Sequence, residues 1–357
     1  MGCPCSTRPP SRIRDLFGAV RAHAASAAIA GAYLPRNPAI MPTTTMGRPF
    51  NRRAIACLLP LAALAGAPAC AQSGPAAAPF GHGNGKLLLT GGVSTIDGAA
   101  GGGLTPWAVI ASYATERQWG ATAHATRVKT HDYGLNAYGA AVGIADRVEL
   151  SIARQDFDTG ATGTALGLPG LRLKQDIVGV KWRVLGDAVV DSDTWLPQVA
   201  VGLEHKHLDA GGLAPTLDAL GAGTQGTDVY LSASKLFLAQ GVLLNATLRA
   251  TKANQNGLLG FGGTARSGYS LQPEISAAWL LRRNLAIGAE YRAKPDNLNP
   301  SILGNGLKED DWADVFVAWA PCKALSLTLA YVDLGHIVPA VATRRQTGAY
   351  LSAQVAF

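Results

Sequence analysis

Cysteine is scarce in this chain, and its distribution is uneven. Only Cys322 lies beyond residue 71, and the other four cysteines fall before it: Cys3, Cys5, Cys57 and Cys70. A single thiol cannot form an intramolecular disulfide, so residues 72–357 are not a small secreted domain held together by disulfides. A lone cysteine is compatible with an exported protein whose stability comes from a closed, hydrogen-bonded sheet.

An excess of basic residues is also absent once the first 71 residues are set aside. The formal charge of +7 comes from this leader, which has one acid, Asp15, and eight arginines: Arg8, Arg12, Arg14, Arg21, Arg36, Arg48, Arg52 and Arg53. The rest of the chain carries 23 basic and 23 acidic residues. A neutral chain without a basic run gives no support to nucleic-acid binding.

Long hydrophobic runs are missing beyond the leader, where no 18 consecutive residues are apolar, so no transmembrane helix is expected. Within it, Arg52 and Arg53 precede a short apolar stretch at 54–67, followed by a small-x-small site ending at Ala71. This pattern predicts a signal peptide over 46–71 with cleavage before Gln72. Residues 1–45 are interpreted as upstream sequence, with translation starting at Met46 or Met41. Lipid modification of Cys70 is disfavoured because Ala67 replaces the leucine expected three positions earlier.

Residues 72–104 are rich in Gly, Ala and Pro and have few large apolar side chains, which indicates a flexible or lumen-inserted segment. From residue 105 onward the hydrophobic period becomes two. In 242–251, for example, Val242, Leu244 and Leu248 alternate with polar residues such as Asn245 and Arg249. Such runs are about nine to fourteen residues long, the length that a tilted strand needs to cross a bilayer. Residues 105–357 are therefore predicted to form an all-β, transmembrane, antiparallel up-and-down β-barrel.

The connections between the runs alternate in length. Short turns, as at 145–147 and 282–284, alternate with long Gly- and Asp-rich loops at 157–170, 209–226, 255–267, 296–310 and 338–346. This asymmetry is typical of outer-membrane barrels. It predicts 12 strands starting near Trp119, or 14 if 86–93 and 105–113 also join the sheet. Six tryptophans near the strand ends are expected in aromatic girdles: Trp119, Trp182, Trp195, Trp279, Trp312 and Trp319.

The last strand alternates up to a terminal aromatic residue. Leu351, Val355 and Phe357 are interpreted as the signal that the barrel assembly machinery recognises.

Charged side chains on the parity opposite the apolar face are predicted to point into the lumen. They are Lys181, Arg183, Glu204, Lys206, Arg249, Glu274, Glu290 and Arg292. Arg249, Glu274, Glu290 and Arg292 lie at similar depth on successive strands and are expected to form one cross-strand ion-pair network. The network either fills a closed interior or forms a constriction that selects solutes by charge. Its balanced signs predict little preference for anions or cations.

Motifs for catalysis or metal binding are weak. His205 and His207 share a strand face but are expected to be polar residues of the outer rim, and the acidic stretch around Glu309 is expected to be a solvated loop; no metal and no cofactor are predicted. A membrane lipid hydrolase would need a serine and a histidine at one height on the lipid-facing surface. His124 and Ser151 are the nearest candidates, and nothing in the sequence brings them together. An enzyme is therefore not expected.

Three blocks of the sequence resemble a proteobacterial family of exported, outer-membrane proteins, catalogued as domain of unknown function 3034. They are Gly85-Lys86-Leu87-Leu88-Leu89-Thr90-Gly91-Gly92-Val93, Gly101-Gly102-Gly103-Leu104-Thr105-Pro106-Trp107-Ala108 and Asp146-Arg147-Val148-Glu149-Leu150-Ser151. The resemblance covers most of residues 85–357. It implies an outer-membrane location and carries over no catalytic residue.

The function favoured by these patterns is a passive channel or transport barrel for small solutes in the outer membrane. The alternatives are a structural or adhesion barrel that acts through its outer loops and, less favoured, an outer-membrane hydrolase. Expected partners are outer-membrane lipid, lipopolysaccharide, the barrel assembly machinery and small solutes, with no nucleic acid. A soluble periplasmic β-protein is the alternative to the fold itself.

Overall fold

A computed structural model describes residues 81–82, 85–188 and 195–357. Residues 46–71, where the sequence predicts a signal peptide, and the upstream extension 1–45 lie outside this range.

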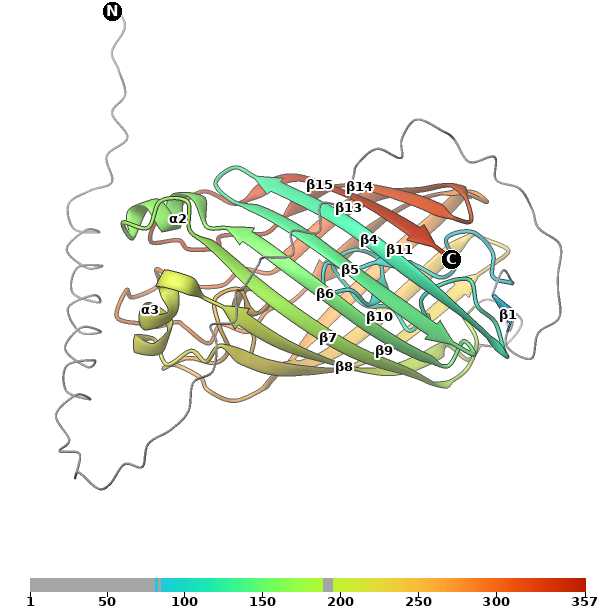
Figure 1. The fold of residues 1–357 in the computed structure, drawn as a ribbon, viewed down its shortest axis with the longest axis horizontal. Coiled ribbons are helices and arrows are strands. Elements are labelled where there is room, and N and C mark those ends of the chain that lie inside the picture. Colours follow the sequence, from blue (N-terminus) through green and yellow to red (C-terminus); the bar gives the residue numbers. More distant parts are fainter. Residues whose placement is uncertain (1–80, 83–84, 189–194) are drawn as a thin grey trace, which may run out of the picture.

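Twelve antiparallel strands close into a barrel (Figure 1), in which each strand pairs with the next and the last pairs with the first. They are β4 (Gln118–Thr130), β5 (Gly134–Ile144), β6 (Val148–Asp158), β7 (Arg172–Leu185), β8 (Gln198–Asp209), β9 (Gln225–Phe237), β10 (Val242–Thr251), β11 (Ser270–Arg282), β12 (Leu285–Arg292), β13 (Trp312–Cys322), β14 (Leu325–Asp333) and β15 (Thr347–Ala356). The prediction of a 12-strand barrel is thus confirmed.

The two faces of each strand differ as the alternation predicts. Outward side chains such as Ile152, Val178, Leu271 and Leu329 are between 55% and 65% exposed, whereas their immediate neighbours face the interior. In water, such a continuous apolar surface would be unfavourable; in a bilayer it contacts lipid. The barrel is therefore a transmembrane barrel. No helix in the described ranges is long and apolar enough to cross a membrane.

The barrel has a turn end and a loop end. The turn end carries most of the short connections and the last residue, Phe357 (Figure 1). Longer connections at the opposite end contain α2 (Gly160–Ala165), η1 (Gly211–Leu213), α3 (Ala214–Ala219) and η2 (Asn254–Gly257). These loops pack on one another through buried apolar side chains: Leu213, Leu217, Leu220, Leu259, Leu298, Leu307, Ile337 and Val338. They cover the loop end of the barrel.

The alternative with 14 strands is wrong. Residues 86–93 and 105–113 join no barrel strand; the chain from 85 to 117, which we call the luminal segment, runs inside the barrel before β4 begins at Gln118 (Figure 1). Residues 105–117, assigned to the barrel from the sequence, thus continue this segment. It contains β2 (Val93–Ser94) and β3 (Ala100–Gly101), which pair as a small hairpin, while β1 (Gly81–His82) pairs in parallel with β4.

One tryptophan departs from the predicted girdles. Trp182, Trp279 and Trp319 are exposed on the outer face, but Trp312 is only 3% exposed and faces the interior. The reason is parity: Val315 and Val317 face outward on β13, so Trp312 falls on the inward side of that strand.

Candidate functional site: a plugged lumen

The luminal segment fills the barrel because its backbone approaches the wall closely. Its three consecutive glycines, Gly101 to Gly103, permit this approach. A Cβ on Gly102 would lie 2.2 Å from Glu290 Oε1, and one on Gly101 would lie 2.1 Å from the carbonyl oxygen of Thr105. Glycine at 102 therefore lets the segment lie against the wall, and glycine at 101 lets the segment fold closely on itself. Of residues 72–104, which the sequence left either flexible or lumen-inserted, residues 85–104 belong to the luminal segment, whereas 72–80 and 83–84 lie outside the described residues.

Two buried glutamates of the wall hold the backbone of the luminal segment. Glu290 of β12 accepts hydrogen bonds from the amide of Leu104 at 2.8 Å, and from the amide and hydroxyl of Thr105 at 3.3 and 2.5 Å. Glu149 of β6 accepts from the amides of Ala100 and Ala111 at 3.0 and 2.8 Å. Hydrogen bonds to a carboxylate are among the stronger ones in proteins, so these residues anchor the segment at two heights.

A lysine completes the second anchor. Lys181 Nζ on β7 lies 3.1 Å from the Glu149 carboxylate. It also donates to the carbonyl oxygens of Ala100 and Val109, at 2.9 and 3.0 Å. Both side chains are 1% exposed. The other hydrogen bonds of Glu149 and Lys181 are made with the luminal segment. Without the segment, this ion pair would face an open lumen.

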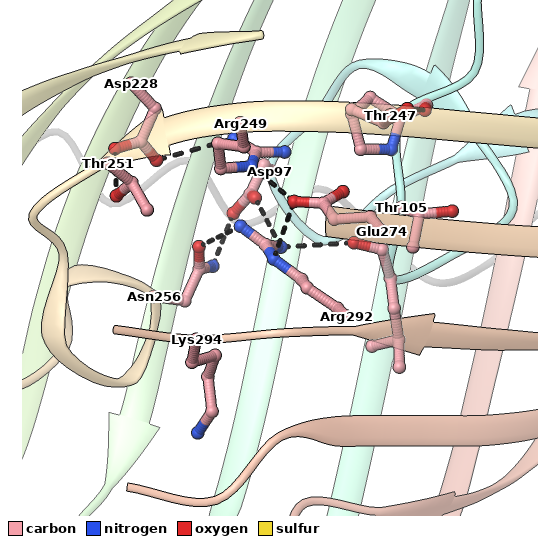
Figure 2. Close-up of polar contacts among 12 residues, drawn as sticks. Asp97, Thr105, Asp228, Thr247, Arg249, Thr251, Asn256, Glu274, Arg292 and Lys294 are labelled. Carbon is pink, nitrogen blue, oxygen red and sulfur yellow. Dashed lines mark hydrogen bonds and ion pairs between the residues drawn. The ribbon is translucent and has the colours of Figure 1, made fainter. Parts of the chain in front are cut away.

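Inside the barrel, on the side of the loop end, lies a cluster of buried charges, which we call the central cluster (Figure 2). Arg249 on β10 contacts three carboxylates: Glu274 Oε1 at 2.5 Å from its Nε, and Glu204 Oε2 and Asp228 Oδ2 at 2.7 and 3.4 Å from its Nη1. The cluster also contains two further cations, Lys206 and Arg292, together with Asp97 of the luminal segment.

The other cations of the cluster connect the wall to the luminal segment. Lys206 Nζ lies 3.0 Å from Asp228 Oδ2 and 3.3 Å from Asp97 Oδ2. Arg292 lies 3.3 Å from Glu274 and 3.2 Å from Asp97. Asp97 thus shares its Oδ2 between β8 and β12, two strands that are not neighbours in the barrel. This arrangement ties the hairpin of the luminal segment to both walls.

The eight charges predicted to face the lumen are all buried, at 4% exposure or less: Lys181, Arg183, Glu204, Lys206, Arg249, Glu274, Glu290 and Arg292. The structure brings Arg249, Glu274 and Arg292 together as expected, but Glu290 binds the luminal segment instead of an arginine. Arg183 lies near the turn end, 3.0 Å from Asp146 and 3.1 Å from Asp187.

Four residues of these networks were missed in the sequence. Glu149 and Asp228 have the inward parity of β6 and β9 and could have been found by the same rule that identified Glu204. Asp97 and Asn256 lie in irregular segments, where no repeating pattern in the sequence indicates which way a side chain points. Their role depends on contacts with residues distant in the sequence: Asp97 is more than 50 residues from Gln155, Lys206 and Arg292, and 159 residues from Asn256.

A second buried pair lies in the loop cap, outside the strands. Lys294 Nζ lies 3.5 Å from Glu309, which also accepts hydrogen bonds from the backbone amide of Gln255. Burial raises the pKa of Glu309 to about 7 despite the neighbouring lysine, and burial lowers the pKa of Lys294 to about 8. The expectation that the acidic stretch around Glu309 is a solvated loop is therefore wrong for this residue.

Toward the turn end, the contact between segment and wall becomes apolar. Leu89, Val93 and Trp107 of the luminal segment pack with Leu236 and Phe316 of the wall around a cavity of about 30 Å³. That space is the size of one water molecule, so the region is packed like a protein core. This apolar contact is a second kind of anchor for the segment.

A larger cavity of about 900 Å³ lies at the turn end itself. Its lining is mixed, with Lys86, Asp146 and Arg183 on one side and apolar residues such as Leu196 and Leu238 on another. Lys86 Nζ lies 2.6 Å from Asp146 Oδ1 and donates to the carbonyl oxygen of Ile110. The luminal segment thus closes the inner side of this vestibule.

The residues considered for metal binding and hydrolysis do not assemble into a site. His205 and His207 face outward, and His205 Nδ1 lies 2.9 Å from Thr227 Oγ1. In the described part of the chain, no group of three or more His, Cys, Asp or Glu side chains is arranged to hold a metal ion. His124 and Ser151 are buried in the interior, and neither ring nitrogen of His124 has a hydrogen-bond partner among the described residues.

The residues interpreted as the assembly signal lie at the end of the last strand. Leu351, Val355 and Phe357 are 57%, 40% and 63% exposed on the outer face. The amide of Phe357 donates to the carbonyl oxygen of Ala121 at 2.8 Å, which continues the seam between the first and last strands to the end of the chain.

Comparison with known proteins gives a family and a set of barrels with little sequence similarity. No curated protein matches the sequence. Among solved structures, the KdgM porin in complex with disordered oligogalacturonate is 8% identical, with a TM-score of 0.42 and coverage of 66% of this chain and 99% of the porin. The NanC porin is 6% identical, with a TM-score of 0.42 and coverage of 66% and 98%.

Outer membrane phospholipase A from Escherichia coli is 8% identical to the chain, with a TM-score of 0.36 and coverage of 66% of this chain and 89% of the phospholipase. The model of one protein family matches residues 90–354, which include most of the luminal segment and all of the barrel except the last two residues of β15. The chain therefore belongs to the family described as protein of unknown function DUF3034.

Proposed function

We propose that this protein is an outer-membrane barrel that transports small solutes, and that the luminal segment closes its pore in the resting state. The observation that carries this proposal is the polar wall around the segment. Buried ion pairs contribute little to stability compared with apolar side chains of similar volume. A wall whose only role was to pack against a permanent plug would gain nothing from the central cluster, whereas the wall of a pore must be solvated when the plug moves.

The location and orientation follow from the same proposal. The apolar belt would contact outer-membrane lipid, and the loop end would face outward beside lipopolysaccharide. Export would be directed by the signal peptide expected at 46–71. The barrel assembly machinery would recognise the outward face of β15 at Leu351, Val355 and Phe357. In this orientation the vestibule of about 900 Å³ opens toward the periplasm.

Two barriers block a solute path along the barrel in this state. The luminal segment occupies the middle, and the packed leucines of the loop cap cover the outer end. Passage of a solute therefore requires that the segment move away from the central cluster. Gating by a plug also accounts for the balanced charges of the wall, because they pair with one another when the segment withdraws.

One observation favours a second function, a permanently closed structural barrel. Leu236, Leu243 and Phe316 face the interior near the turn end and are at most 4% exposed because the luminal segment covers them. If the whole segment left the barrel, these side chains would be exposed to water at a cost of about 1.5–3 kcal/mol each. Transport is therefore compatible with movement of the hairpin but not with expulsion of residues 87–93.

A reversible crosslink between the segment and the wall tests the proposal. Thr105 Oγ1 and Ser276 Oγ lie 2.5 Å apart, so a Thr105→Cys/Ser276→Cys variant, made with Cys322→Ser, brings two thiols within reach of a disulfide. The folded variant is identified by its electrophoretic mobility before and after boiling. Its conductance is then measured in planar bilayers, oxidised and reduced.

For a transport barrel, we expect the oxidised variant to be silent and the reduced variant to conduct. The Thr105→Cys variant with Cys322→Ser is the matched control, because it has a thiol but cannot form the crosslink, and it should conduct in both states. If the reduced variant, the control and the parent protein are all silent in the folded form, the barrel is structural.

A further inference from the structure

The carboxylate of Asp97 occupies a site built by four donors from separate parts of the barrel. Its Oδ1 accepts hydrogen bonds from Gln155 Nε2 at 2.9 Å and from Asn256 Nδ2 at 2.7 Å. Its Oδ2 lies 3.3 Å from Lys206 Nζ and 3.2 Å from Arg292 Nη1. All four donor side chains are buried, with exposures of 4% or less.

The donors belong to the barrel, and only the acceptor belongs to the luminal segment. Asp97 is the only charged residue between positions 87 and 115. It lies at the tip of the hairpin, in a turn closed by hydrogen bonds from the amide of Thr95 to the carbonyl of Ala99 and from the amide of Gly98 to the carbonyl of Thr95. The hairpin thus presents a single carboxylate to the donors, of which Figure 2 labels Asn256 and Arg292.

The orientation of the Asn256 amide is fixed by its other partners. Its Oδ1 accepts from Lys206 Nζ at 2.6 Å and from Arg292 Nη2 at 2.8 Å. Lysine and arginine can only donate, so the amide oxygen must face them and the amide NH₂ must face Asp97. The groups nearest to the carboxylate are therefore donors, two for each oxygen, an arrangement that fits a planar carboxylate and repels a cation.

We propose that Gln155, Lys206, Asn256 and Arg292 form a binding site for the carboxylate of a small anionic solute, and that Asp97 is the built-in occupant that the solute replaces. This inference rests on the proposed transport function, because a solute reaches the site only when the hairpin withdraws. Withdrawal without a replacement removes one carboxylate from the two cations, which keep their carboxylate partners in the wall, and leaves the two amides without an acceptor, which is costly. A solute carboxylate removes that cost, so the solute itself favours the open state.

The binding is expected to be weak and to depend on the neighbouring donor groups. The wall residues of the central cluster are balanced, with Glu204, Asp228 and Glu274 opposite Lys206, Arg249 and Arg292. A carboxylate is therefore selected by the positions of the donors and not by net charge. Such a site discriminates a carboxylate from chloride, which cannot use two pairs of donors at once.

Chemical rescue of an Asp97→Ala variant of the whole chain tests the site. Removal of the carboxylate leaves a space that formate or acetate fills. We expect Asp97→Ala to lose its compact electrophoretic form at a lower temperature than the parent protein, and formate or acetate to restore most of that loss. Sodium chloride at the same ionic strength and neutral acetamide should restore none of it. Asp97→Asn, which fills the space without a charge, should not respond to formate.

Further variants test whether the rescue by formate depends on the cationic donors. The double variant Asp97→Ala/Lys206→Gln should lose the response to formate, because one of the two cationic donors is gone. If Asp97→Ala does not fold alone, its refolding yield in formate relative to chloride is the same measurement. Equal effects of formate and chloride, on unfolding or on refolding, overturn the anion site.

Conductance separates this inference from the proposed function. If formate stabilises Asp97→Ala but neither this variant nor the parent protein conducts in bilayers, the site stands and transport is wrong. If the proteins conduct but formate gives no specific rescue, transport stands and the carboxylate site is wrong.

Discussion

Arg249 is the residue whose loss tests the account of the lumen most directly. Its guanidinium is 2% exposed and lies within 3.4 Å of three buried carboxylates, Glu204, Asp228 and Glu274. Replacing it with methionine preserves much of the side-chain volume but leaves these carboxylates with fewer cations. Removal of one partner of a buried ion pair costs about 3–5 kcal/mol, because the remaining charge is uncompensated. We expect a loss of this size in the free energy of unfolding.

The barrel offers a matched control on its surface. Arg154 forms a bidentate pair with Asp176, at 2.6 Å for both bonds, but the two side chains are 63% and 50% exposed. Exposed pairs contribute about 0.2–1 kcal/mol. The Arg154→Met variant should therefore be destabilised by about 3 kcal/mol less than Arg249→Met, roughly a hundredfold difference in the folding equilibrium constant.

Urea titration of the proteins refolded into lipid vesicles measures this difference, with electrophoresis of unboiled samples reporting the folded fraction. Adding Glu274→Gln to Arg249→Met should recover part of the loss, because it removes one uncompensated carboxylate. If Arg249→Met and Arg154→Met unfold at the same urea concentration, the central cluster is not a buried, compensated network and the reasoning fails.

Three further predictions concern the luminal segment and the loop cap. Gly102→Val should increase proteolysis of residues 85–117 in the folded barrel, because a side chain there overlaps Glu290; unchanged protection would contradict the close approach. Trp107→Ala should reduce the free energy of unfolding in urea by about 3–5 kcal/mol, because a buried aromatic side chain leaves a cavity; a loss below 1 kcal/mol would argue against tight packing there. The closed cap holds a proton on Glu309 more tightly than an open cap, with pKa values of about 7 and 4.5, so the stability of the closed cap should fall as pH rises between these two values. Hydrogen exchange at the Gln255 amide, corrected for the intrinsic rate, should show this trend in the parent protein and not in Glu309→Gln.

Much of the barrel could be predicted because side-chain direction in a strand is a local property. Alternation places Ile152 and Leu271 outside and Lys181 and Glu274 inside without knowledge of any neighbour. The same rule would have placed Trp312 inside; the error arose because its position near a strand end was given more weight than its parity. The alternation of short and long connections limited the strand number to 12 or 14.

The role of the luminal segment could not be predicted in the same way. Its Gly-rich sequence has no period, so neither its course nor the direction of Asp97 can be read from it. The sequence also allowed 86–93 and 105–113 to join the sheet as strands. They remain outside it because the twelve strands close on one another and leave no free edge in the barrel.

The sequence by itself determined the membrane-facing belt and the inward charges and limited the number of strands to 12 or 14, since each depends on the two-residue period of an extended backbone and on turn length. Only the tertiary structure decided which inward charges meet, that Glu290 binds a backbone while Arg249 binds three carboxylates, and that Asp97 completes a site built from β6, β8, β12 and the loop after β10. The physical reason is that contacts across a lumen depend on the closure and register of the whole barrel. Closure and register bring together residues separated by tens to hundreds of positions in the sequence. No local sequence pattern indicates where each of these residues lies along the barrel axis.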